Sequence, residues 1–161
     1  MRRRAEARVA STLAAEPAAV AAWALSAEGI NFELAPWLRM TVPRGASGLD
    51  VHSLRPGPVG RSWLLAFGLI PVDYDEIGLV RVDPEGGFLE RSTMLSQRRW
   101  EHERTIAASE VGTVVVDRIA WEPRAPLPGS LLRPLFAAFF RHRHRRLRHR
   151  FGGEPLPPSS P

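Results

Sequence analysis

Apolar residues recur along this chain with two different spacings, and these spacings divide it into strands and helices. Between residues 61 and 121, short segments alternate apolar and polar positions, which is typical of β-strands that bury one face. Turn-forming residues such as Pro84 and Gly112 separate these segments, and such short connections predict an antiparallel meander. The predicted strands of this meander are 61–68, 73–83, 87–95, 98–107 and 113–121.

Helical spacing precedes the meander. Pro17 stands where a helix takes its first residue, and Val20 and Trp23 follow at helical intervals. Gly29 interrupts the pattern, so a second, shorter helix is predicted over residues 30–36. Two more strands are predicted over residues 5–13 and 37–42, and a loop rich in Gly and Pro over 43–60.

A final helix is predicted from Leu131 to Gly152, with an apolar first half and an arginine-rich second half. Ser130 is the expected N-cap, and Pro134 falls in the first turn, where its missing N–H donor is tolerated. The predicted apolar stripe that packs on the sheet includes Leu135 and its neighbouring phenylalanines. A long helix after a meander limits the fold to few architectures.

The chain length of 161 residues suits a single domain, which we assign to residues 1–152, with a disordered Pro- and Ser-rich tail over 153–161. The absence of cysteine excludes a disulfide framework, a thiolate metal site and a cysteine nucleophile. No apolar segment approaches the roughly 18 residues of a membrane span, and the N-terminal segment lacks the apolar core of a signal peptide. We therefore expect a cytoplasmic protein.

The net charge of +5 comes largely from the two ends of the chain. Residues 141–150 hold six arginines and three histidines, which could bind the phosphates of nucleic acid or anionic lipid. The alternative is that these cations stabilise the carbonyl end of their helix and pair with Asp or Glu nearby. Nucleic acid is disfavoured because no aromatic stacking platform accompanies the charge. The residues of a patch for an anionic partner would be Arg141, Arg143, Arg145, Arg146, Arg148 and Arg150.

No metal, cofactor or hydrolase motif is found in the sequence. On a helix, His142 and His144 point to different faces, and His149 lies two turns from His142. The chain has neither a Gly-x-Ser-x-Gly nucleophile elbow nor a glycine-rich phosphate loop. We therefore expect no metal site and no cofactor.

One predicted strand directs polar side chains toward the interior. Trp100 and Ile106 mark its inner face, and His102 and Arg104 share that face. In an antiparallel register with the next strand, Asp117 also points inward, opposite either His102 or Arg104. A buried charge persists only when it is paired. The group could form a structural ion-pair network, orient a ligand or act as acid and base.

The element order is that of the helix-grip fold, and the sequence resembles the START-like (SRPBCC) superfamily. The resemblance lies in Glu16–Trp23, Trp100–Arg104, Asp117–Trp121 and Phe139–Leu147, the last similar to the ending of bacterial members. It implies an α+β fold in which a curved antiparallel sheet wraps around the long C-terminal helix, with two short helices near the N-terminus. A pocket would lie between the sheet and that helix.

The superfamily includes polyketide cyclases, steroidogenic lipid-transfer domains and plant ligand receptors. The resemblance therefore implies non-catalytic binding of a small hydrophobic molecule, such as a lipid or a polyketide. One alternative is a cyclase or aromatase in which His102 and Asp117 form an acid–base pair. A second alternative is an interaction module that uses the arginine-rich helix, and a homodimer is left open.

The expected ligand contacts are aromatic and apolar side chains with a few inward polar groups. They are Trp63, Phe67, Phe88, Glu90, Met94, Trp100, His102, Arg104, Asp117, Trp121, Phe136 and Phe139. The predicted core adds Trp23, Ile119 and Leu135.

Overall fold

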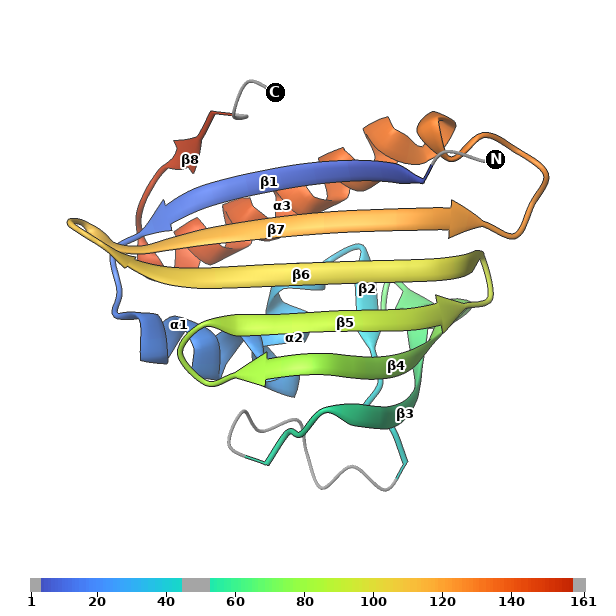
Figure 1. The fold of residues 1–161 in the computed structure, drawn as a ribbon, viewed down its shortest axis with the longest axis horizontal. Coiled ribbons are helices and arrows are strands. Elements are labelled where there is room, and N and C mark those ends of the chain that lie inside the picture. The colour runs from blue at the N-terminus through green and yellow to red at the C-terminus, as the bar shows by residue number, and fades with distance from the viewer. Residues whose placement is uncertain (1–3, 45–52, 158–161) are drawn as a thin grey trace.

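A computed structural model describes residues 4–44 and 53–157, and its strands form one eight-stranded sheet in the order β2-β3-β4-β5-β6-β7-β1-β8 (Figure 1). Neighbouring strands pair antiparallel. For β3 to β7 this is the meander that the sequence predicts. The strands are β1 (Ala5–Leu13), β2 (Leu38–Met40), β3 (Gly57–Ala66), β4 (Ile70–Asp83), β5 (Gly87–Met94), β6 (Gln97–Ser109), β7 (Gly112–Pro123) and β8 (Pro155–Leu156).

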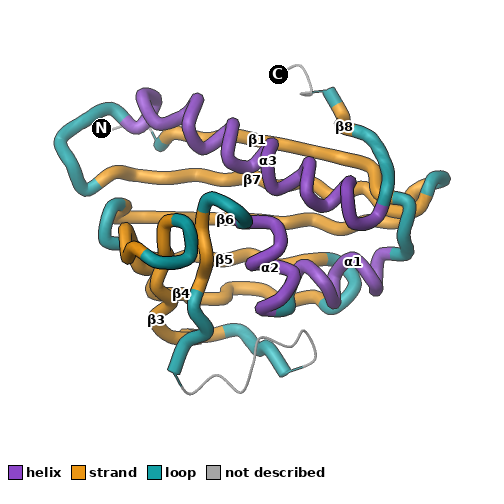
Figure 2. The backbone as a smooth tube through the Cα atoms, turned by 180° about the vertical axis from the view of Figure 1, so that it is seen from behind, coloured by secondary structure: helices purple, strands orange, loops and turns teal. Residues whose placement is uncertain are grey.

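Three α-helices cover one face of this sheet (Figure 2). They are α1 (Pro17–Ala24), α2 (Ala27–Leu34) and α3 (Arg133–Phe151), and a short 3-10 helix, Gly129–Leu132, leads into α3. This is the predicted helix-grip α+β fold, with two short helices near the N-terminus and a long one at the C-terminus. Within the described ranges, no helix is long and apolar enough to cross a membrane.

Helix α2 begins three residues earlier than the sequence predicts. Ser26 caps it, because the Ser26 hydroxyl accepts a hydrogen bond from the Gly29 N–H at 2.9 Å and donates one to the Trp23 carbonyl at 2.8 Å. Gly29 therefore lies inside the first turn and does not interrupt the helix. A Cβ at Gly29 would lie 1.8 Å from the Trp23 carbonyl oxygen, so this close approach of two helix ends requires glycine.

The start of α3 also differs from the prediction. Leu132, without a side-chain cap, precedes α3, and Ser130 lies in the 3-10 helix instead of acting as the N-cap. Leu135 is 62% exposed, so its assignment to the core is wrong. The buried stripe of α3 instead runs through Phe140 and Leu147, with Arg143 and His144 between them. Because two polar residues occupy the middle of this stripe, the apolar pattern alone places the helix face incorrectly.

Between β6, β7 and α3, two apolar layers enclose a polar layer, and a third apolar cluster forms around Leu25 and Phe88. One apolar layer surrounds Ile106 and Leu147, and the other surrounds Ile119 and Phe140. The register of β6 and β7 produces this order, since Ile106 pairs with Val115, then Arg104 with Asp117, His102 with Ile119 and Trp100 with Trp121. The polar layer is therefore enclosed on both sides along the strands.

The tail is ordered further than predicted. Strand β8 pairs with β1, and the Thr12 N–H donates to the Glu154 carbonyl at 2.9 Å. Gly153 makes this approach possible, because its φ is +110° and a Cβ there would lie 2.0 Å from the Thr12 carbonyl oxygen. The prediction of disorder from residue 153 therefore fails for residues 154–156, while residues 158–161 lie outside the described ranges.

Candidate functional site

Arg104 is the centre of the polar layer and is fully buried. Its Nε and Nη2 atoms donate to the two Asp117 carboxylate oxygens at 2.8 and 2.7 Å. Its Nη1 and Nη2 atoms donate to the two oxygens of Glu33, on α2, at 2.7 and 2.9 Å. One guanidinium thus makes bidentate contacts to two carboxylates, the geometry in which arginine binds them most strongly.

Two histidines and a second arginine complete this network. His102 Nε2 lies 3.0 Å from Asp117 Oδ1, and His144 Nε2 lies 3.1 Å from Asp117 Oδ2. Because an ionised carboxylate only accepts hydrogen bonds, each of these imidazole nitrogens carries its proton. Arg143 Nε donates to Glu33 Oε2 at 3.0 Å. Two guanidinium groups therefore balance two carboxylates, and the network is neutral when both histidines are neutral.

The electrostatics of the network favour these charge states. Burial would raise the pKa of Asp117, but Arg104 and His102 outweigh it and hold that pKa well below its usual range. The pKa of Glu33 is also lowered. Burial would raise it, but the neighbouring guanidinium groups of Arg104 and Arg143 outweigh burial. Burial lowers the pKa of His102 despite the attraction of Asp117. At neutral pH the carboxylates are therefore ionised and His102 is neutral.

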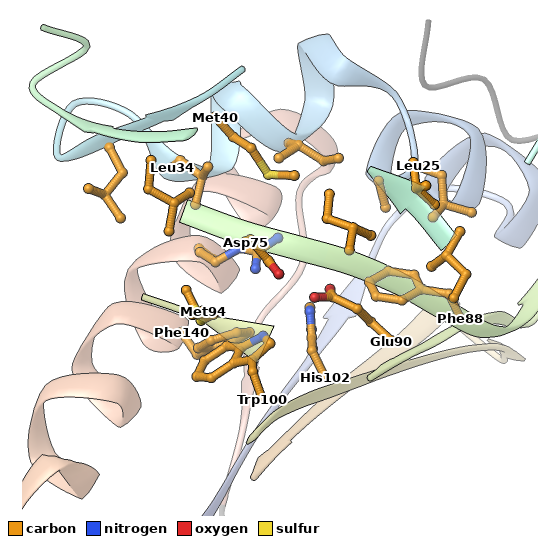
Figure 3. Close-up of a pocket in the computed structure, with 18 of the residues that line it drawn as sticks. Leu25, Leu34, Met40, Asp75, Phe88, Glu90, Met94, Trp100, His102 and Phe140 are labelled. Atoms are coloured by element: carbon orange, nitrogen blue, oxygen red, sulfur yellow. The ribbon is translucent and has the colours of Figure 1, made fainter. Parts of the chain in front are cut away.

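A cavity of about 130 Å³ lies beside the network, between strands β2 to β6 and the helices (Figure 3). Its volume is roughly ten times the ~10–15 Å³ that one water needs on this measure. Six of the residues predicted to contact a ligand line it: Phe88, Glu90, Met94, Trp100, His102 and Phe139. The sequence reasoning missed other lining residues, including Leu25, Leu34, Met40, Asp75, Phe140 and Arg143.

The structure places four of the other predicted contacts inside the protein but away from the cavity wall. Arg104 and Asp117 lie in the network, whereas His102 and Arg143 belong to both the network and the cavity wall. Trp121 and Phe136 pack against each other in an apolar layer, with ring centroids 4.8 Å apart. These four side chains support the cavity without lining it.

Trp63 and Phe67 are exposed, by 42% and 64%, and do not contact the cavity. On β3, Ser62 is buried and Leu64 lines the cavity, so strand alternation turns Trp63 to the opposite face. There the Trp63 ring packs against Tyr74. Both aromatic residues therefore lie away from the pocket predicted for them, because Ser62 and Leu64 occupy the inner face of β3 and Phe67 follows the end of that strand.

An acidic pair lines the cavity on the sheet side. Asp75 is 7% exposed, and Glu90 on the neighbouring strand accepts a hydrogen bond from the Ser92 hydroxyl at 2.6 Å. Burial, then the Glu90 carboxylate, raises the pKa of Asp75 well above its usual value. Asp75 shares its face with Ile77 and Leu79, and that alternation is the sequence signal that could have identified it.

The arginines of the proposed anionic patch mostly contact the protein itself. Arg143 pairs with Glu33, Arg146 lies over the Phe32 ring and Arg150 over the Trp23 ring. Arg148 donates to Ser11 at 2.7 Å, and Arg145 lies 3.1 Å from a His142 ring nitrogen. Arg141 is exposed. These contacts favour an internal role for the arginine-rich half of α3.

Comparisons with known proteins agree with this architecture. The sequence model of a family described as "Domain of unknown function (DUF8410)" matches residues 11–151. A search of curated proteins gives no match.

Similar solved structures include a protein from Chromobacterium violaceum, with a TM-score of 0.69 and 15% identity over 91% of this chain and 97% of that one. A START superfamily protein from Mycobacterium smegmatis has a TM-score of 0.64 and 12% identity over 92% and 96% of the two chains. A protein of the dynemicin biosynthetic locus has a TM-score of 0.57 and 14% identity over 92% of this chain and 48% of that one. These likenesses show that the fold is START-like.

Proposed function

The chain belongs to the DUF8410 family and has the START-like fold, and on this premise we propose that it binds a small, mainly apolar molecule in the cavity between the sheet and α3. The observation that carries this proposal is the cavity's composition. Most of its wall is aliphatic or aromatic, and four ionisable side chains line it: Asp75, Glu90, His102 and Arg143. Apolar walls with a few convergent polar groups are typical of small-molecule sites.

The state of the polar network supports binding without catalysis. Asp117 is ionised, accepts hydrogen bonds from Arg104, His102 and His144, and does not line the cavity. A carboxylate whose pKa is held so low is a weak base, and its lone pairs are already engaged. The network therefore fixes the wall of the cavity, and of its members His102 and Arg143 face a ligand.

A cyclase-type enzyme is the second candidate. It is favoured by one observation, that His102 lines the cavity while its Nε2 contacts Asp117, an arrangement that orients an imidazole. One structural neighbour comes from the dynemicin biosynthetic locus. In this case His102→Ala would abolish conversion of a bound polyketide-like substrate while ligand retention persisted. Equal conversion by the variant would exclude His102 as the catalytic group.

Native mass spectrometry of the purified protein, followed by organic extraction, tests the binding function. We expect a stoichiometric adduct of an apolar small molecule. Leu79 lines the cavity and Val80 beside it is 44% exposed, so Leu79→Trp should remove the adduct and Val80→Trp should keep it. Circular dichroism checks that both variants are folded. A folded protein without an adduct, and with no thermal shift against lipid and polyketide panels, would contradict the proposal.

A further inference from the structure

We propose that the ligand of this cavity carries a protonated amine on an apolar body, and that the carboxyl groups of Asp75 and Glu90 bind the amine. The inference rests on the proposed function, because it names the ligand class of the same cavity.

The two carboxyl groups converge on the cavity from neighbouring strands. Asp75 lies on β4 and Glu90 on β5, and both are among the lining side chains drawn in Figure 3. Ser92 lies near both, and its hydroxyl donates to Glu90 Oε1 at 2.6 Å. This hydrogen bond fixes the Glu90 side chain on the sheet side of the cavity, so the pair is held by strands and not by a loop.

Asp75 has a buried oxygen with no partner. The residue is 7% exposed, and its Oδ1 has no hydrogen-bond partner among the residues that the structure describes, although the carboxyl group also interacts with Glu90 and Ser92. An unsatisfied buried oxygen costs about 1–3 kcal/mol, and native proteins keep few of them. A hydrogen-bond donor supplied by a ligand would satisfy this atom.

The charge of the pair is also uncompensated in the described part of the chain, where neither Asp75 nor Glu90 forms an ion pair. The cavity's own cation, Arg143, pairs with Glu33 at 2.9 Å and lies over the Phe140 ring. His102 is kept neutral by burial. Because a charge in an apolar cavity needs a counter-charge, the ligand is the component that can provide it.

A protonated amine fits this pair better than a neutral or an anionic group does. Burial and the Glu90 carboxylate raise the pKa of Asp75, so the empty pair retains a proton. An ammonium group supplies both the missing donor and the missing positive charge, and it favours loss of that proton. A hydroxyl group supplies only the donor, and a carboxylate is repelled by Glu90. Amine binding should therefore strengthen as the pH rises.

Three six-carbon probes of matched shape test the inference: hexylamine, hexanol and hexanoate. We expect calorimetry at pH 7.5 to show hexylamine binding at least tenfold more tightly than hexanol, with hexanoate weakest. Hexylamine affinity should rise between pH 5.5 and 7.5, with proton release revealed by buffers of different ionisation enthalpy. Hexanol affinity should not change with pH.

Asp75→Asn and Glu90→Gln should each remove the preference for hexylamine while hexanol still binds. Glu76→Gln is the matched control, since Glu76 neighbours Asp75 on β4 but pairs with Arg61 on the exposed side of the sheet. It should leave the preference unchanged. Equal affinity for hexylamine and hexanol, or tighter binding of hexanoate, would overturn the amine inference and leave the proposed function intact. Failure of all three probes to bind would count against the proposed function itself.

Discussion

Replacing Arg104 by methionine should destabilise this protein more than any other single replacement of an arginine. Arg104 is fully buried and makes hydrogen bonds of 2.7–2.9 Å to Glu33 and Asp117. Methionine has a similar length and no charge, so it fills the space but leaves two buried carboxylates. Glu33 would keep Arg143, whereas Asp117 would keep only its contacts to the imidazoles of His102 and His144.

The magnitude follows from the loss of one partner in a buried ion pair, which costs about 3–5 kcal/mol because the other charge stays buried. For a chain of this size, each kcal/mol lowers Tm by about 2–4 °C. The expected fall in Tm is therefore roughly 6–20 °C. Such a loss is a large part of the ~5–15 kcal/mol by which domains are stable.

Urea unfolding at pH 7, followed by circular dichroism, measures this change. Arg148→Met is the matched control, because Arg148 is only partly buried and contacts Ser11 rather than a carboxylate. Its cost should stay below about 1 kcal/mol, as for most changes outside a buried network. A triple variant, Arg104→Met with Glu33→Gln and Asp117→Asn, should recover part of the loss because it removes both uncompensated charges. A single-variant cost under about 1 kcal/mol, or a triple variant less stable than the single one, would refute this reasoning.

Three further predictions concern the pH dependence of stability and the packing of α3. The lowered pKa of His102 means that folding disfavours the charged imidazole, so the free energy of unfolding falls as the pH drops below about 6.5. In urea titrations, His102→Gln should therefore lose less stability between pH 7 and pH 5 than the wild type does. Asp75 has the opposite effect, because folding raises its pKa. The protein therefore loses stability as the pH rises above about 4, the pKa of an aspartate in the unfolded chain. Asp75→Asn should therefore be more stable than the wild type at pH 8, and an unchanged urea midpoint there would contradict the charge state assigned to Asp75. On α3, Phe140→Ala should cost about 3–5 kcal/mol, whereas Leu135→Ala at an exposed position should change stability by less than about 0.5 kcal/mol, as measured by thermal melting.

The sequence was sufficient for the order of the elements because strand alternation and helix spacing are local. The inner face of β6 follows from the same alternation, and the expectation that Asp117 faces Arg104 or His102 is met by contacts to both. The partner Glu33 could not be predicted, since it comes from α2, far away in sequence. Such contacts depend on how a helix packs against a sheet, and the spacing of residues within either element does not specify that packing.

For the candidate site, too, some residues can be placed from the sequence around them and others cannot. Phe88 and Met94 line the cavity, and alternation on a strand is sufficient to place them on its inner face. Trp63 and Phe67 share the more apolar face of residues 61–68 with Leu65, so alternation itself favoured them. Yet the structure exposes both and turns Leu64 to the cavity. Asp75 was overlooked because a carboxyl group on a strand is normally expected to face water.

The pairing of β8 with β1 has a consequence for solubility. Without β8, the nine-residue strand β1 would be the edge strand of the sheet. The backbone N–H and C=O groups on its side away from β7 could then pair with another chain. Pro155 and Leu156 cover part of that row, and Pro155 itself has no N–H to offer a further strand. At the opposite border, β2 is only three residues long and pairs with residues 64–66 of β3. The short segment after α3 therefore protects the protein from sheet-to-sheet aggregation, and shortening the chain at residue 152 would expose a template for it.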